Sequence, residues 1–161
     1  MRKKWILAFY SFLLGFLFSF WIFSKRFITI NKESKRKNDK LYKSYVLLIE
    51  WLSWKSRKKN IAEWLLNRDI KSVAIYGMGE LGNRLYEDLS KFEDVINVNY
   101  VIDNNITNTF SELPVLSLED NLPKVDAIIV TPFFAFESIE NSIKKKLPDT
   151  NIISLAEIFD I

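Results

Sequence analysis

The sequence predicts an α/β fold in which a parallel sheet of about five strands is flanked by helices and preceded by a transmembrane helix and an amphipathic helical linker. Short apolar runs typical of buried strands alternate with helical patterns from residue 72 onward. Three of the four glycines, Gly77, Gly79 and Gly82, directly follow the first of these runs. Residues 5–23 contain no charged side chain, which is typical of a membrane span.

Composition and charge exclude several classes of function. The 161 residues suffice for one domain and a short appendage. Histidine and cysteine are absent, which excludes imidazole acid–base chemistry, thiol nucleophiles, disulfides and the common zinc and iron–sulfur ligand sets. The formal charge is +8 over residues 1–40, +4 over residues 41–71 and −9 over residues 72–161. An acidic domain argues against a nucleic-acid partner, and a basic amino-terminal segment favours a membrane surface.

Residues 1–24 are predicted to form an amino-terminal transmembrane anchor. As a helix, residues 5–23 would be about 28 Å long, close to the thickness of the hydrocarbon core of a bilayer. Trp5 and Trp21 lie near the two ends, where aromatic rings favour the headgroup region. The alternative is a cleaved signal peptide, whose apolar segment is shorter and ends at small residues. Here the apolar stretch runs into Lys25 and Arg26, which favours the anchor.

Residues 25–40 are predicted to form a basic juxtamembrane linker that lies against anionic lipid. Eight Lys or Arg residues follow the span between positions 25 and 43, and three precede it. The positive-inside rule therefore predicts a single-pass protein of the cell membrane whose carboxy-terminal domain is cytoplasmic, although the basic amino terminus favours the opposite orientation. A flexible, solvated linker is the alternative for residues 25–40.

Residues 41–70 are predicted to contain two amphipathic helices. Apolar residues recur at helical spacing in the first, at positions 41, 45, 48 and 52. Asn60 and Glu63 have the spacing of a capping box at the start of the second. Trp51 and Trp54 lie in the helices of residues 41–66. One interpretation is that these helices contact a protein partner or a second copy of the chain. The other is that the two tryptophans pack on the domain that follows them. We favour packing.

Residues 71–161 are predicted to form the parallel-sheet domain. Strands are expected at residues 72–76, 98–102, 115–116, 125–131 and 151–154. Apolar residues recur at helical spacing at positions 81, 85 and 89, and again at 139, 143 and 147. Ser117 and Asp120 are predicted to start another helix after the third strand, and a final turn follows the fifth strand.

The spacing Gly-x-Gly-x-x-Gly at residues 77–82 lies between a strand and a helix, which is typical of a dinucleotide-binding loop. The first glycine permits a tight turn, the second lets a phosphate approach backbone N–H groups, and the third lets the helix pack on the strand. Asp103 ends the second strand, where a carboxylate accepts hydrogen bonds from ribose hydroxyls. The alternative is a turn kept for packing, with Asp103 and Asn104 as turn residues. The charge of Glu80 favours this alternative because it would repel a pyrophosphate, and Arg84 either offsets that charge or is solvated.

Thr131, Pro132 and Phe133 follow the fourth strand. In an open α/β sheet a ligand binds beyond the carboxyl ends of the strands where the strand order reverses, here between the first and fourth strands. Phe133 and Phe134 are candidates for stacking on a base or sugar, although aromatic residues near strand ends more often close the core. No catalytic or metal-binding residue is predicted. The predicted cofactor-binding residues are Gly77, Met78, Gly79, Glu80, Leu81, Gly82, Asp103, Asn104, Thr131, Pro132 and Phe133.

Residues 71–161 resemble the short Rossmann-like domains of bacterial surface-polysaccharide biosynthesis proteins, in particular the amino-terminal sugar-nucleotide-binding domain of bacterial sugar acyltransferases. The matching segments are residues 75–82, 101–103, 113–115 and 126–131. The resemblance implies a UDP-sugar, or a dinucleotide such as NAD or NADP, contacted by the glycine loop and Asp103. The hexapeptide-repeat β-helix that performs acyl transfer in those enzymes, and the histidine that it uses, have no counterpart in this sequence. Acyltransferase activity is therefore not implied.

The sequence thus predicts a membrane-anchored, non-catalytic protein that binds a nucleotide or nucleotide sugar, as an accessory of bacterial surface-polysaccharide biosynthesis. Neither the Tyr-x-x-x-Lys pair of short-chain dehydrogenases and sugar epimerases nor the Asp-x-Asp of metal-dependent glycosyltransferases is present. The alternative is a membrane-tethered scaffold whose Rossmann-like domain binds a protein partner and no nucleotide. A third hypothesis is an enzyme that acts together with residues of a partner.

Overall fold

The computed structural model describes residues 2–103 and 112–161, and for residues 2–14, 16 and 17 it describes the backbone alone. Asn104, a predicted site residue, lies outside the described residues. The chain divides into two units, Met1–Ser44 and Tyr45–Ile161.

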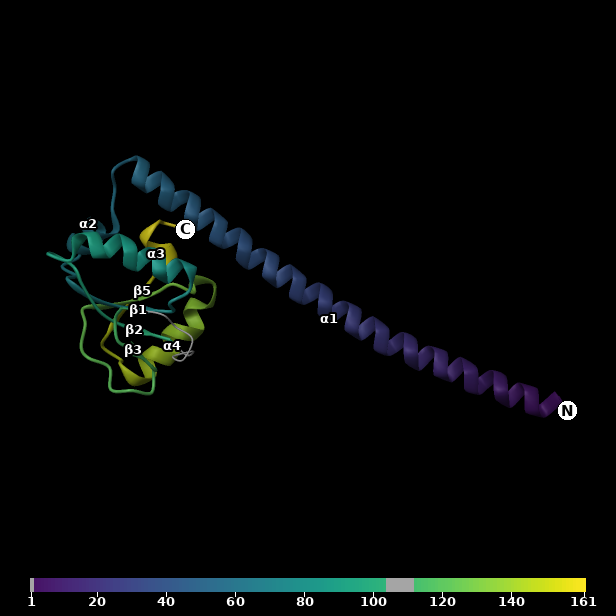
Figure 1. Cartoon of the computed structure of the whole chain (residues 1–161). Helices are drawn as coiled ribbons and strands as arrows, with labels where there is room; N and C mark the ends of the chain where they lie inside the picture. The colour runs from purple at the N-terminus through teal and green to yellow at the C-terminus, as the bar shows by residue number, and fades with distance from the viewer. Residues whose placement is uncertain (1, 104–111) are drawn as a thin grey trace. The chain divides into compact units, whose positions relative to one another are not determined.

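The first unit consists of the greater part of helix α1, which runs without interruption over Arg2–Ser56 (Figure 1). Residues 25–40 are therefore helical, and the flexible linker considered as the alternative for them is not formed. The hydroxyls of Ser24 and Thr29 donate to backbone carbonyls one turn earlier, at 2.8 and 3.0 Å. Such hydroxyls are satisfied within the helix itself.

The predicted membrane span, residues 5–23, belongs to this helix. Most of its side chains lie outside those that the structure describes. Among the residues that are described, no helix is both long enough and apolar enough to cross a bilayer.

The Tyr45–Ile161 unit is built on a five-stranded sheet in the order β3-β2-β1-β4-β5 (Figure 1). Every neighbouring pair of strands is parallel, and the five predicted strands are confirmed. Ile75 in the central strand pairs with Val101 on one side and with Ile129 on the other. The strands are β1 (Ser72–Tyr76), β2 (Asn97–Ile102), β3 (Val115–Leu116), β4 (Ala127–Val130) and β5 (Asn151–Ser154).

Helices cover both faces of this sheet. Asn60 caps the first of them, since its side-chain oxygen accepts the N–H of Glu63 at 2.7 Å, as the capping-box spacing predicts. Among residues 57–103 and 112–161, the helical segments are α2 (Ile61–Leu66), α3 (Glu80–Leu89), η1 (Ser90–Phe92), η3 (Phe133–Ala135), α4 (Phe136–Lys146) and α5 (Leu155–Ile158).

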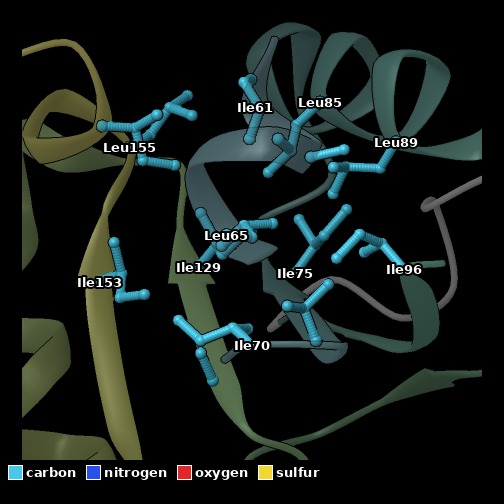
Figure 2. Close-up of a cluster of buried hydrophobic side chains, with 14 of the residues drawn as sticks. Ile61, Leu65, Ile70, Ile75, Leu85, Leu89, Ile96, Ile129, Ile153 and Leu155 are labelled. Carbon is cyan, nitrogen blue, oxygen red and sulfur yellow. The ribbon is translucent and has the colours of Figure 1, made fainter. Parts of the chain in front are cut away.

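The core forms two layers because successive strand residues point to opposite faces of the sheet. On one face, Ile75 and Ile129 pack with Leu65 of α2 and Leu85 of α3 (Figure 2). On the other face, Ala74, Ile128 and Val130 belong to a separate cluster that includes Ile143 of α4. Full burial of one such aliphatic side chain contributes about 1.5–3 kcal/mol.

The helix predicted to start at Ser117 is not formed, and this prediction is wrong. Asp120 Oδ2 accepts the N–H of Ser117 at 2.7 Å, and Ser117 Oγ accepts the N–H of Glu119 at 3.1 Å. Together these bonds close a turn. Pro123 follows within one helical turn and disfavours helical backbone at the residue before it, so an irregular segment leads from β3 to β4.

The carboxyl end of α1 packs on the domain, as we favoured from the sequence. The ring of Trp51 lies 5.3 Å from that of Phe159, and Trp54 meets the same ring edge-on at 5.0 Å. The indole N–H of Trp51 donates to Asp88 on α3 at 2.7 Å. Leu47, one turn earlier, is fully buried.

Candidate nucleotide site

The glycine loop, residues 77–82, lies at the carboxyl end of β1 in the centre of the sheet. The Gly77 N–H donates to the Ile102 carbonyl at 2.8 Å, and the Thr131 N–H donates to the Tyr76 carbonyl at 3.0 Å. These bonds extend the pairing of β1 with β2 and β4 beyond the strand ends. The loop and Thr131 therefore meet where the strand order reverses, the position at which α/β sheets bind ligands.

Gly77 is required by the chain's own structure. Its φ of +89° is favourable only for glycine. A Cβ atom there would lie 3.0 Å from Pro132 Cδ and 3.1 Å from Thr131 Oγ1. The buried Thr131 hydroxyl donates to the Gly77 carbonyl at 2.7 Å. Thr131 and Pro132, both predicted site residues, thus hold the turn in place.

Gly82 is also required by packing within the chain. It is buried in the first turn of α3. A Cβ atom at this position would overlap the carbonyl oxygen of Gly77. Glycine here lets α3 begin directly against the turn that ends β1, which is the role of the third glycine in the motif.

Gly79 differs from both. Apart from Gly79 itself and its two neighbours in the chain, no described atom lies within 4 Å of the place where its Cβ would stand. Its φ of −78° and ψ of −164° are extended backbone that any residue adopts. Gly79 is the N-cap of α3, and no described side chain caps this end of the helix. Backbone N–H groups of the first turn, with the positive end of the helix dipole, therefore face a position without a side chain.

Asp103 lies beside the same loop. Its Oδ2 accepts the N–H of Met78 at 2.9 Å, which ties the glycine loop to the end of β2. Asp103 is partly buried and Met78 is buried. The carboxylate predicted to contact ribose is therefore close enough to the loop for that role, and one of its oxygens already holds the loop.

The surface next to the loop is acidic. Glu80 is exposed at the start of α3, and it lines one shallow hollow together with Arg84, Glu87 and Glu112. Arg84, the candidate to offset Glu80, instead pairs with Glu87 at 2.7 Å. Burial, followed by the charge of Glu112, raises the pKa of Tyr86 in this hollow. An anionic ligand at the loop would meet unfavourable charge from Glu80.

The two phenylalanines after β4 have different surroundings. Phe133 is partly buried and packs against the core cluster on the α2 and α3 side. Phe134 is exposed, and its ring meets that of Phe133 edge-on with centroids 5.8 Å apart. Phe133 therefore closes the core, as the alternative interpretation held, while Phe134 presents a ring to solvent. Leu81 is partly buried and packs against the same cluster as Phe133.

Asp88 on α3 is a carboxylate that no pattern in the sequence indicated. It accepts hydrogen bonds from Trp51 at 2.7 Å, Lys55 at 2.7 Å and Lys91 at 3.3 Å. Burial raises the pKa of Asp88, but the hydrogen bonds from Lys55 and Trp51 outweigh it and hold that pKa below its ordinary value. The sequence does show a tryptophan and a lysine one turn apart on an amphipathic helix, but this spacing does not predict which carboxylate they contact.

Comparison with known protein families, with curated proteins and with solved structures finds no match to this chain. The resemblance to the nucleotide-binding domain of sugar acyltransferases therefore stays a prediction from the sequence.

Proposed function

We propose that the domain of residues 71–161 binds a nucleotide or nucleotide sugar without catalysing a reaction, and that residues 1–24 anchor it to the cell membrane. Gly79 carries the proposal. Packing within the chain requires Gly77 and Gly82, whereas nothing among the described residues requires glycine at position 79. Open space beside the uncapped amino end of a helix supports the approach of a phosphate group.

The ligand classes that we propose are UDP-sugars and NAD or NADP. Their phosphates would accept hydrogen bonds from the first backbone N–H groups of α3, at Glu80 and Leu81. The ribose would lie towards Asp103, and the exposed ring of Phe134 would contact a base or sugar. Because Glu80 repels the phosphates, Glu80→Gln is expected to bind the same ligand more tightly, by about 3-fold to 10-fold.

We also propose that the anchor holds the domain on the cytoplasmic side, beside enzymes of bacterial surface-polysaccharide biosynthesis. The uncharged stretch of residues 5–23 and the larger number of Lys and Arg after it support this orientation. A tag at the carboxy terminus is expected to be inaccessible from outside intact cells. Labelling of that tag from outside would overturn the cytoplasmic position.

Thermal unfolding of the full chain tests ligand binding, with UDP-glucose, UDP-N-acetylglucosamine, NAD and NADP as probes. A ligand at about 100 times its Kd adds about 2.7 kcal/mol to the free energy of unfolding. Gly79→Val is the decisive variant, because its side chain would enter the space proposed for the phosphate, and its Cβ would have no contact beyond the neighbouring residues of the chain. We expect its stability without ligand to change by less than about 1 kcal/mol, because the unfavourable N-cap residue is offset by the lower entropy of the unfolded chain. Its ligand-induced shift should be lost. No shift with any probe, or an equal shift in Gly79→Val, would refute nucleotide binding.

A membrane-tethered scaffold that binds a protein partner and no nucleotide is the second candidate. The bond from Met78 to Asp103 favours it, since the loop satisfies this donor internally, and so does the exposed charge of Glu80. In this case the same partner would be recovered by crosslinking from cells that express the wild type or Gly79→Val, and neither protein would respond to nucleotides.

A further inference from the structure

A groove lies between the carboxyl end of α1 and the carboxyl half of α3, within the Tyr45–Ile161 unit. It consists of two adjoining hollows of about 200 and 140 Å³. The two hollows share Trp51, Lys55, Asp88 and Lys91 in their walls. The groove contains no residue of the glycine loop, so it is a separate surface.

The larger hollow is cationic. Lys55, Lys59 and Lys91 line it, and Asp88 is the only carboxylate among its lining residues. The Nζ atoms of Lys55 and Lys91 lie 2.7 and 3.3 Å from the same Asp88 oxygen, so the two ammonium groups are close to each other. The other Asp88 oxygen is taken by the indole of Trp51. Asp88 thus pairs with two of the three ammonium groups that line the hollow, and an anion would relieve the repulsion among the three.

Three aromatic rings also line this hollow. Trp51 and Trp54 each pack against Phe159 there. The Nζ atom of Lys59 lies 5.5 Å from the centre of the Trp54 ring. Lys59 makes no ion pair within the described part of the chain, so its charge is available to a ligand while its stem lies on the ring.

The smaller hollow is apolar along the α1 side. Leu48 and Leu52 line it, with 40% and 61% of their surface exposed. Arg84 and Glu87 on its α3 side neutralise each other through an ion pair at 2.7 Å. The groove therefore places the lysine ammonium groups beside exposed leucine side chains, a combination that matches a molecule with an anionic head and an apolar tail.

We propose that this groove binds a lipid with a phosphate headgroup. The phosphate would lie among Lys55, Lys59 and Lys91, since lysine ammonium groups bind phosphate as point charges. The acyl chain would cover Leu48 and Leu52, which removes their apolar surface from water. The proposal is independent of nucleotide binding, and a failure of either one leaves the other standing.

The test uses the full chain in phosphatidylcholine nanodiscs, titrated with dihexanoyl phosphatidic acid. Lys59→Gln removes one headgroup contact and disturbs no ion pair, and we expect it to raise the Kd about tenfold. Lys58→Gln is the matched control, because Lys58 is the adjacent exposed lysine and does not line either hollow. Its Kd should equal that of the wild type. Equal affinity of the two variants would overturn the proposal.

Two further titrations separate the headgroup from the tail. Dihexanoyl phosphatidylcholine should not compete, because its headgroup carries no net charge, and inorganic phosphate should compete only at far higher concentration. Leu52→Ser should weaken phosphatidic acid and leave the response to inorganic phosphate unchanged. Competition by phosphatidylcholine or by inorganic phosphate at the same concentration as phosphatidic acid would overturn the proposal. So would a dimeric wild type whose Leu52→Ser variant is monomeric, since a second copy of the chain would then cover the groove.

Discussion

Alanine substitution should destabilise the protein at Gly82 and leave its stability nearly unchanged at Gly79, although both glycines belong to the same loop. At Gly82 the new methyl group would overlap the Gly77 carbonyl oxygen. Forcing extra volume into filled space costs about 1–3 kcal/mol. The upper part of this range applies because the obstructing atom belongs to the backbone and is held by the Thr131 hydroxyl at 2.7 Å. Replacing glycine with alanine in a helix returns up to about 1 kcal/mol, so Gly82→Ala should lose about 2 kcal/mol of unfolding free energy.

At Gly79 the methyl group would enter open space on extended backbone, so Gly79→Ala should change the free energy of unfolding by less than about 0.5 kcal/mol. Urea unfolding of the full chain, followed by tryptophan fluorescence, to which buried Trp51 contributes, measures both variants. With a slope of about 2 kcal/mol per molar urea, the midpoint of Gly82→Ala should fall by about 1 M. Equal midpoints for the two variants, or a more stable Gly82→Ala, would refute the assignment of Gly82 to packing and of Gly79 to a ligand.

Three further outcomes follow from buried contacts. Thr131→Val should lose about 1–2 kcal/mol in urea unfolding because the Gly77 carbonyl loses its donor, and Thr131→Ser should recover most of the loss; a neutral Thr131→Val would contradict the role of the hydroxyl. Leu65→Ala should cost about 2–5 kcal/mol because Leu65 is fully buried, and an equal cost for Leu52→Ala, at an exposed position, would be inconsistent with the core described above. The lowered pKa of Asp88 contributes stability that is present above about pH 4 and lost as the pH falls through its folded-state pKa. Below about pH 4 the unfolding temperature should therefore fall less steeply with pH in Asp88→Asn than in the wild type. An equal fall in the two proteins would exclude Asp88 as a source of acid sensitivity.

The sheet could be predicted from the sequence because most residues of its strands are apolar and buried. Ala127–Val130 is buried at every position, which is typical of a central parallel strand. The strand order could be predicted because a glycine loop of this spacing is typical of a sheet whose first strand lies in the centre, next to the fourth. Ser117 misled the prediction because a serine followed three residues later by an aspartate suits a turn as well as a helix start.

The candidate site was predicted as a set of positions, but the roles within the set required coordinates. The spacing of Gly77, Gly79 and Gly82 treats the three alike, and only their surroundings separate the two that serve packing from the one that faces open space. The bond from Met78 to Asp103 joins residues far apart in the sequence, so no local pattern indicates it. The same holds for Asp88, whose donors come from α1 and from the residues just after α3.

The contact of Trp51 and Trp54 with Phe159 has a consequence for synthesis of the protein on the ribosome. Helix α1 emerges first, but the ring against which its carboxyl end packs is made more than a hundred residues later. Until then two tryptophans remain without their aromatic partner, on a surface that other chains can reach. The last packing step of the Tyr45–Ile161 unit therefore follows translation of Phe159. Nascent chains that stall before Phe159 expose an aromatic surface that is prone to aggregation.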